Sequence, residues 1–301
     1  MNTLVPEVLI EDEALRDGLQ IETRLFSVEE KLHFVKAIAA AGVRRIQVGS
    51  FVHPKWVPQM ANTDALFAAL TPIPGVTFSA LILNMAGLER ALAAKVEHLS
   101  ISVSASETHS KKNTNKTVAE ALDGIKPTLE RALSEGIKVR AGIQSALGCG
   151  FEGRIDPEQV KRIARIYSEI GVDEINIADT AGLSNPKLTY DVCTMVRDAV
   201  RPEIKLSLHL HDTRGLGLAN MVAGLQAGVT TFDAAVGGLG GCPFIPKATG
   251  NIATEDAVYA LEEMGVKTGI DWRKLAGVAL ELEALIGRTL PGRMAHLAPA
   301  A

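Results

Sequence analysis

Two histidines separated by one residue, His209 and His211 in "HLHDT", are the clearest chemical signal in the sequence. They end a segment that reads as a strand, and alternate residues of a strand point to the same side. Two imidazoles on one inward face are typical of metal ligands, although a polar pair satisfied by neighbouring strands has the same spacing. The pattern favours a metal site at the end of this strand.

A second chemical pair, Arg16 and Asp17 of "RDGLQ", follows the first expected strand. Adjacent residues cannot both face inward from a regular strand, so we expect the chain to turn here, which Gly18 allows. Asp17 could give a carboxylate oxygen to the same metal, and Arg16 could bind an oxyanion. The alternative is a local salt bridge or turn without a function.

Two further polar residues are expected close to these groups. Asn251 of "ATGNIATED" is expected to begin a helix as its N-cap, near the histidines, where its amide oxygen could complete a metal site. Imidazoles with carboxylate and amide oxygens form a harder ligand set than thiolates, which favours Mg²⁺ or Mn²⁺ over Zn²⁺. Asp179 of "INIADTAG" would project into the mouth as a proton carrier, or cap the next helix.

A cysteine, Cys242, lies in the glycine-rich stretch "GGLGGCPFIPKATGN" of residues 237–251. Glycines allow such a loop to turn sharply or move, and they let a substrate approach the backbone. A lone cysteine is most often a small buried hydrophobe. Beside a cation, however, its thiol could have a lowered pKa and carry a proton.

The elements that must position these residues are short apolar runs that alternate with helical patterns. Strands are expected at residues 8–13, 44–51, 76–83, 98–105, 137–143, 174–180, 205–211 and 231–236. Helical segments such as 27–42 and 117–136 lie between them, and the first opens with a capping box at Ser27 and Glu30. Repeated strand–helix pairs require parallel strands with right-handed crossovers.

Eight such units in about 250 residues predict an α/β fold, the closed (β/α)8 TIM barrel. The barrel is expected over about residues 8–265 of a single domain, 1–301, with an additional C-terminal helix at about 270–290 packed on its outside. An open doubly wound sheet would need a glycine-rich turn after the first strand, which "EDEALRDGLQ" lacks. Residues at the carboxyl ends of barrel strands are those that face an active site.

Composition limits the classes of partner. The chain has 301 residues, 47% hydrophobic and 22% charged, with a net charge of −4, so neither nucleic acid nor a membrane is an expected partner. Its three cysteines lack metal-type spacing, and a disulfide framework is not expected. The N-terminal segment resembles neither a signal nor a transit peptide, which predicts a cytoplasmic protein.

The motifs "RDGLQ", "SFVHPKWVPQM", "KKN", "HLHDT", "GLGGCPF" and "TGNIATED" occur in an order and spacing that resembles the 3-hydroxy-3-methylglutaryl-CoA (HMG-CoA) lyase family, over about residues 8–290. "RDG" and H-x-H mark the wider group of metal-dependent barrel lyases and synthases, whereas "SFVHPKWVPQM" and "GLGGCP" are specific to the lyases. The resemblance implies metal-dependent cleavage of HMG-CoA, or a related 3-hydroxy-3-alkylglutaryl-CoA, to acetyl-CoA and a 3-oxo acid. It also implies an acyl-CoA substrate and a homo-oligomer.

The resemblance assigns roles by position. The implied metal ligands are Asp17, His209, His211 and Asn251. The implied catalytic residues are Arg16 on an enolate oxygen, Cys242 in the loop, and Asp179 and His209 in proton transfer. The implied substrate or coenzyme A contacts are Arg16, Gln20, Asn113 and Arg140, and Glu255 is implied to support the site.

The chain departs from the family at three positions. Gln47 and Asp12, both counted here among the catalytic candidates, stand where the family usually has glutamate, and Ile21 replaces a polar residue. An amide keeps the size and hydrogen bonding of a carboxyl group but cannot hold negative charge or take a proton. These departures bear on the rate and on the 3-alkyl group of the substrate.

Other functions remain open at this point. A condensing acyltransferase that joins acetyl-CoA to a 2-oxo acid would share the metal and Arg16 without needing the glycine–cysteine loop. A catalytically weakened barrel that binds acyl-CoA is suggested by Gln47. A metal hydrolase is the weakest alternative, because such barrels usually carry the H-x-H pair on their first strand, not their seventh.

Overall fold

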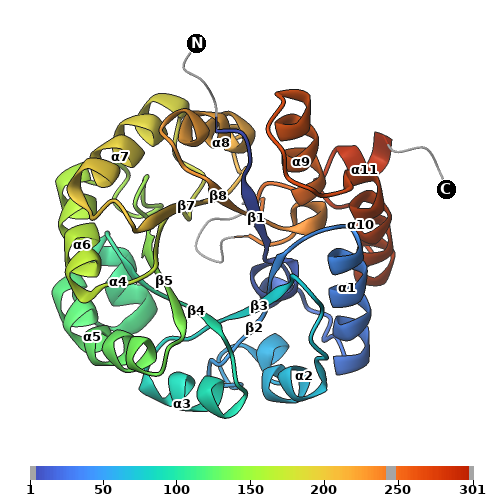
Figure 1. The fold of residues 1–301 in the computed structure, drawn as a ribbon, viewed down its shortest axis with the longest axis horizontal. Helices are drawn as coiled ribbons and strands as arrows, with labels where there is room; N and C mark the ends of the chain where they lie inside the picture. The colour runs from blue at the N-terminus through green and yellow to red at the C-terminus, as the bar shows by residue number, and fades with distance from the viewer. Residues whose placement is uncertain (1–4, 242–248, 298–301) are drawn as a thin grey trace.

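The computed structural model describes residues 5–241 and 249–297. Within them, eight parallel strands close a barrel in chain order, with β8 hydrogen-bonded to β1 (Figure 1). The predicted TIM barrel is confirmed, and each expected strand is found with small shifts at its ends. The strands are β1 Leu9–Asp12, β2 Arg45–Ser50, β3 Thr77–Leu81, β4 His98–Ser104, β5 Lys138–Gln144, β6 Glu174–Asp179, β7 Lys205–Leu210 and β8 Thr231–Ala234.

Helices surround the barrel (Figure 1). The expected capping box is present at the start of α1, where the Ser27 hydroxyl accepts from the Glu30 amide at 3.2 Å and the Ser27 amide donates to the Glu30 carboxylate at 2.8 Å. The helices are α1 Val28–Ala40, α2 Thr63–Ala69, α3 Met85–Ala93, α4 Glu107–Thr114, α5 Val118–Ser134, α6 Pro157–Ile170, α7 Pro186–Ala199, α8 Gly217–Gln226, α9 Thr254–Glu263, α10 Trp272–Ile286 and α11 Met294–Leu297. Short helical turns are η1 Ala14–Gly18, η2 Leu19–Ile21, η3 Pro58–Met60 and η4 Val236–Gly238.

The hydrophobic core lies between the barrel and its ring of helices. Strand residues alternate between the two faces of the sheet, and those facing the helices are buried and apolar, such as Ile46, Leu99 and Ile177. The expected C-terminal helix is α10. It packs outside the barrel against α1 and α9, which confirms the prediction (Figure 1).

The inside of the barrel is charged, although bulky branched apolar residues usually fill this space. Arg45 of β2 forms a two-pronged contact with Glu174 of β6 at 2.9 and 3.0 Å, and its Nε lies 2.6 Å from Glu11 of β1. All three side chains are buried. Because a buried charge is costly unless it is paired, each of these groups depends on partners from the far side of the barrel.

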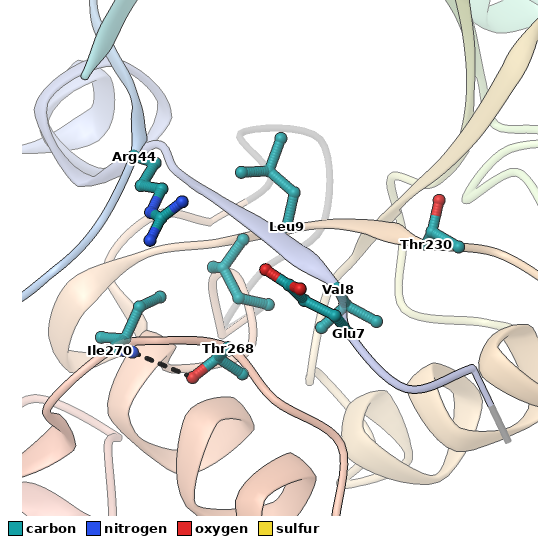
Figure 2. Close-up of a pocket in the computed structure, with 8 residues that line it drawn as sticks. Glu7, Val8, Leu9, Arg44, Thr230, Thr268 and Ile270 are labelled. Carbon is teal, nitrogen blue, oxygen red and sulfur yellow. Dashed lines mark hydrogen bonds between the residues drawn. The ribbon is translucent and has the colours of Figure 1, made fainter. Parts of the chain in front are cut away.

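A pocket of about 270 Å³ opens at the opposite end of the barrel from the predicted site (Figure 2). Its lining comes from the segments that enter the strands, including Val8, Arg44 and Thr230. Active sites of TIM barrels form at the carboxyl ends of the strands, so this pocket is not the candidate site. In the described parts of the chain, no helix is long and apolar enough to cross a membrane.

Candidate active site and metal centre

The turn after β1 brings both members of the Arg16–Asp17 pair into the site. Residues 14–18 form the π-helical turn η1, in which the amides of Arg16 and Gly18 both donate to the Glu13 carbonyl at 3.1 Å. The expected turn is confirmed, but Gly18 is needed there for close packing and not for its backbone conformation. Its φ of −57° suits any residue, whereas an added Cβ would lie 2.8 Å from the Leu239 Cβ, so close packing requires the glycine.

Asp17, His209 and His211 form one buried group whose ligand atoms lie within 4.8 Å of one another. The two imidazole Nε2 atoms are 3.0 Å apart, and His211 Nε2 is 3.7 Å from Asp17 Oδ2. The histidines lie at the end of β7 as predicted, and the aspartate reaches them from the turn after β1. The structure therefore gathers side chains that are some 190 residues apart in the sequence around one point.

Asn251 lies beside this group, but it does not cap a helix. Its amide nitrogen donates to Asp17 Oδ2 at 2.8 Å, and its backbone pairs with His211. The N-cap expectation is wrong because residues 250–252 run extended along the end of β7, and α9 begins only at Thr254. Asn251 Oδ1 is buried and lacks a hydrogen-bond partner among the described residues.

The electrostatics of this group favour a bound cation. Burial alone would lower the pKa of His209, but hydrogen bonds with Asp233 and Glu13 and the charge of Asp17 raise it to about 10. Burial would raise the pKa of Asp17, but Arg16 and the two imidazoles hold it well below its usual range. The site therefore attracts positive charge. The buried Asn251 oxygen and the converging nitrogens fit a divalent metal ion.

Two carboxylates that sequence reasoning did not select orient His209. Its Nδ1 lies 3.3 Å from Asp233 Oδ2 of β8 and 3.5 Å from Glu13 Oε2, which leaves Nε2 facing His211. Outer carboxylates of this kind fix the ring and tautomer of a ligating histidine. A signal was present in the sequence, since acids at Glu11 and Glu13 alternate in the first strand and Asp233 interrupts an apolar one.

Arg16 lies next to the metal ligands, where an oxyanion binder is expected. Its guanidinium donates in three directions, to Glu13 Oε2, to Gln47 Oε1, and to Asp17 Oδ1 at 2.7 Å. Gln47 therefore lies beside Arg16 as its partner, and its expected catalytic role stays a prediction. Gln20 also reaches the ligand group, because its amide donates to Asp17 Oδ1 at 2.9 Å.

Two of the residues expected to contact coenzyme A, Asn113 and Arg140, lie in different places. Asn113 is exposed on α4, which follows the carboxyl end of β4 and so lies on the side of the site. Arg140 is buried inside the barrel, where it contacts Asp233 at 2.5 Å, Glu13 at 2.7 Å and Glu11 at 2.9 Å. The coenzyme A assignment of Arg140 is wrong, because only 3% of the residue is exposed.

Asp12 lies outside the site. It alternates with the inward Glu11, so it faces the helices, where it accepts from the Thr254 hydroxyl at 2.6 Å and the Val236 amide at 2.9 Å. Burial raises its pKa to about 6. Its expected place among the catalytic residues is wrong, and it instead ties β1 to the junction between β8 and α9.

Asp179 was expected to project into the open mouth of the barrel, but its side chain is fully buried. Its two oxygens accept from the amides of Leu183 at 2.8 Å and Ser184 at 3.0 Å. The cap of the following helix α7 is Asn185, so the expectation of a helix cap is wrong, whereas the expected role in proton transfer stays a prediction. Burial raises the pKa of Asp179.

Cys242 lies outside the described residues, and its proposed role stays a prediction.

Glu255 supports the loop that leads to Cys242. Both of its oxygens lie 3.1 Å from the Gly237 amide, and burial, with the charges of Asp256 and Asp12, raises its pKa to about 8. The folded protein thus keeps this proton up to about pH 8, whereas a glutamate in water loses it near pH 4.5. The free energy of unfolding should therefore fall as pH rises through this window.

The variant Glu255→Gln should remove this loss. We expect it to raise the free energy of unfolding at pH 8 by about 1 kcal/mol or more, and to change it little at pH 4.5. Denaturant titrations across pH 4.5–8.5 measure the effect. Glu283→Gln is the control. The Leu290 amide lowers the pKa of Glu283, so this variant should not become more stable than the wild type as pH rises. If the free energy of unfolding of Glu255→Gln falls with pH as steeply as that of the wild type, Glu255 does not carry a buried proton.

A glycine closes the ligand group from the side of the loop. Gly240 has φ +111°, and an added Cβ would lie 2.8 Å from Asn251 Nδ2 and 3.1 Å from Asp17 Oδ2. We expect Gly240→Ala to weaken Mn²⁺ binding by about 10–100-fold, since displaced ligands lose their geometry. Calorimetric titration measures this. Gly265→Ala is the control, since its φ is also positive, at +78°, but nothing lies within 4 Å of the new atom. Equal Mn²⁺ affinities in the two variants would contradict the prediction.

Comparisons with known proteins agree with this site. A model of the HMGL-like family matches residues 7–280. The 3-hydroxy-3-isohexenylglutaryl-CoA/hydroxy-methylglutaryl-CoA lyase of Pseudomonas aeruginosa is 40% identical over 93% of each chain. The crystal structure of HMG-CoA lyase from Bacillus subtilis matches with a TM-score of 0.94 and 37% identity over 98% of each chain. The structure of an HMG-CoA lyase from Acinetobacter baumannii in complex with coenzyme A and 3-methylmalate matches with a TM-score of 0.92 and 35% identity. The match covers 98% of this chain and 96% of that one.

These matches span nearly the whole barrel, including the turn after β1, the end of β7 and the segment before α9. The ligand group and Arg16 lie at the carboxyl ends of the strands, where a TIM barrel carries its chemistry. The chain belongs to the HMGL-like family and is a carbon–carbon lyase of the HMG-CoA lyase type.

Proposed function

We propose that this protein cleaves HMG-CoA, or a 3-hydroxy-3-alkylglutaryl-CoA with a larger alkyl group, to acetyl-CoA and acetoacetate or the matching 3-oxo acid. The observation that carries the proposal is the buried group of Asp17, His209, His211 and Asn251 next to Arg16, at the carboxyl ends of the strands. The oxygen-containing ligand set favours Mg²⁺ or Mn²⁺ over Zn²⁺.

A divalent ion held by these residues would supply Lewis-acid polarisation of the tertiary hydroxyl and a substrate oxygen. The hydroxyl proton is taken by a base, for which Asp179 is the proposed group, with its raised pKa as support. His209 is proposed to assist this transfer as a metal ligand whose Nδ1 is fixed by Asp233 and Glu13. The Cα–Cβ bond then breaks, and its electron pair passes into the thioester enolate. Arg16 stabilises this enolate oxygen through a guanidinium already oriented by three acceptors.

Protonation of the enolate carbon completes acetyl-CoA. Cys242 is the proposed proton carrier, and Asp179 remains a second proposed acid, with its raised pKa as support. Asn113, exposed beside the carboxyl end of β4, is the proposed contact for the coenzyme A chain. We further propose a cytoplasmic homo-oligomer.

The direct test uses purified protein with HMG-CoA and Mg²⁺, Mn²⁺ or Zn²⁺, and measures acetoacetate and acetyl-CoA. We expect turnover with Mg²⁺ and Mn²⁺. Analogues with longer 3-alkyl groups identify the preferred substrate. Condensation of acetyl-CoA with a 2-oxo acid, in the absence of any cleavage, would overturn the lyase direction in favour of an acyltransferase. Binding of acyl-CoA with no reaction in either direction would favour a weakened barrel.

A further inference from the structure

We propose that Glu13 is a positioning residue for the reaction, and that it supplies to Arg16 and His209 the negative charge that the Gln47 amide cannot provide. The proposal rests on the proposed function for its catalytic consequence. Its structural part concerns how one buried carboxylate holds an oxyanion binder and a metal ligand at the same time.

Glu13 contacts both sides of the site from one fixed place. It is fully buried just after β1. One of its oxygens, Oε2, accepts from Arg16 and lies 3.5 Å from His209 Nδ1, while Oε1 accepts from Arg140 at 2.7 Å. Arg140 is itself buried and paired, so it anchors the carboxylate. Glu13 therefore connects Arg16 and His209 with no intervening residue.

Gln47 occupies a place where an amide satisfies both neighbours. Its Oε1 accepts from Arg16, whereas its Nε2 donates to Glu11 Oε1 at 3.3 Å and to the Ser100 hydroxyl at 3.2 Å. A glutamate at position 47 would direct a carboxylate oxygen at the Glu11 carboxylate, and like charges so close in a buried site are unfavourable. The amide thus fits the presence of Glu11, and the negative charge facing Arg16 from the barrel comes from Glu13.

This arrangement also protects the metal ligands. The third partner of Arg16 is Asp17, through the Oδ1 atom that also accepts from Gln20. If an uncharged residue replaces Glu13, the Arg16 guanidinium pairs mainly with Asp17. The guanidinium then competes with a cation for the Asp17 carboxylate. His209 loses one of its two orienting carboxylates in the same step. Loss of Glu13 should therefore weaken metal binding as well as catalysis.

The test is an exchange of charge between the two positions. Glu13→Gln should lower kcat by about 10–100-fold, and Mn²⁺ affinity by about 10-fold, as for other outer partners of metal ligands, with KM changed little. Gln47→Glu alone should also lower kcat, because it adds a third carboxylate around Arg16, besides those of Glu13 and Asp17. The double variant should retain at least about tenfold more activity than the product of the two single effects, because it restores two carboxylates around Arg16, those at positions 47 and 17.

Glu130→Gln is the matched control, since Glu130 is an exposed residue of α5 with one surface partner 4.0 Å away. It should leave kcat and Mn²⁺ affinity unchanged. Glu13→Asp, which keeps the charge on a shorter side chain, gives a second variant should the amide fail to fold. Its kcat should lie between those of the wild type and Glu13→Gln, because the charge is kept but the shorter side chain reaches Arg16 and His209 less well.

Mn²⁺ affinity, measured by calorimetry without substrate, separates this proposal from the proposed function. If the wild type cleaves no 3-hydroxy-3-alkylglutaryl-CoA, but Mn²⁺ affinity falls in Glu13→Gln and recovers in the double variant, the function fails and the positioning role stands. If the wild type is active and Glu13→Gln keeps kcat within twofold, the positioning role is overturned. Additive effects in the double variant would overturn the exchange of charge between positions 13 and 47, and a loss of thermal stability with unchanged kcat would show a purely structural role.

Discussion

Arg16→Lys should lower kcat for HMG-CoA cleavage by about 10²–10³, the usual cost of removing an oxyanion donor. Lysine keeps the positive charge, so the expected loss comes from geometry. The guanidinium donates simultaneously to Glu13, Gln47 and Asp17, and these three acceptors fix the direction of its remaining N–H groups. An ammonium group on a flexible chain cannot hold that orientation. Steady-state kinetics measure the effect as a fall in kcat.

Two measurements make this prediction specific. Mn²⁺ affinity should change by only a few fold, because all four proposed ligands remain, so the loss of rate cannot be attributed to loss of metal. Arg24→Lys is the matched control, since Arg24 pairs with Glu30 at 2.6 Å outside the site. If kcat in Arg16→Lys stays within threefold of the wild type, Arg16 does not stabilise the enolate.

Removal of a metal ligand should have the second large effect. His211→Ala should weaken Mn²⁺ binding by more than about 100-fold, since loss of an outer partner alone typically costs about 10–100-fold. His211 Nε2 faces both His209 and Asp17, so no neighbouring group can replace it at that point. Activity at limiting Mn²⁺ should fall by the same factor.

Thermal unfolding measures this binding without a substrate. A wild-type protein at 100 times its Kd for Mn²⁺ gains about 2.7 kcal/mol of stability, and the variant should gain almost none at the same concentration. His33→Ala is the control, because His33 is an exposed histidine paired with Glu281 at 2.8 Å. Equal stabilisation of His211→Ala and the wild type by Mn²⁺ would exclude this metal site.

The sequence predicted the barrel well because its strands are bounded by glycines and turns and alternate regularly with capped helices. The H-x-H spacing and the Arg16–Asp17 turn also placed the metal group, since parallel strands bring their carboxyl ends together. Both signals are local, so neither depended on distant contacts.

Other features depended on contacts that no local pattern contains. Arg140 was placed on coenzyme A from a resemblance, but its partner Asp233 lies 93 residues away and inside the barrel. Glu11 and Asp12 are neighbours in one strand, and the alternation does not tell which of two acids faces inward. Asn251 has the residue type of a helix cap, but pairing with the end of β7 moves the cap two residues on, to Ala253.

The charged interior of the barrel also bears on how the chain can be divided. Arg45 of β2 depends on Glu174 of β6, and Arg140 of β5 depends on Asp233 of β8 and Glu11 of β1. A fragment that ends after β4 would keep the Arg45–Glu11 pair but would lack Glu174 and Arg140, the other partners of these two residues. Half-barrels of this protein are therefore poor autonomous folding units, and a growing chain on the ribosome completes its ionic pairing only when the last strand has emerged.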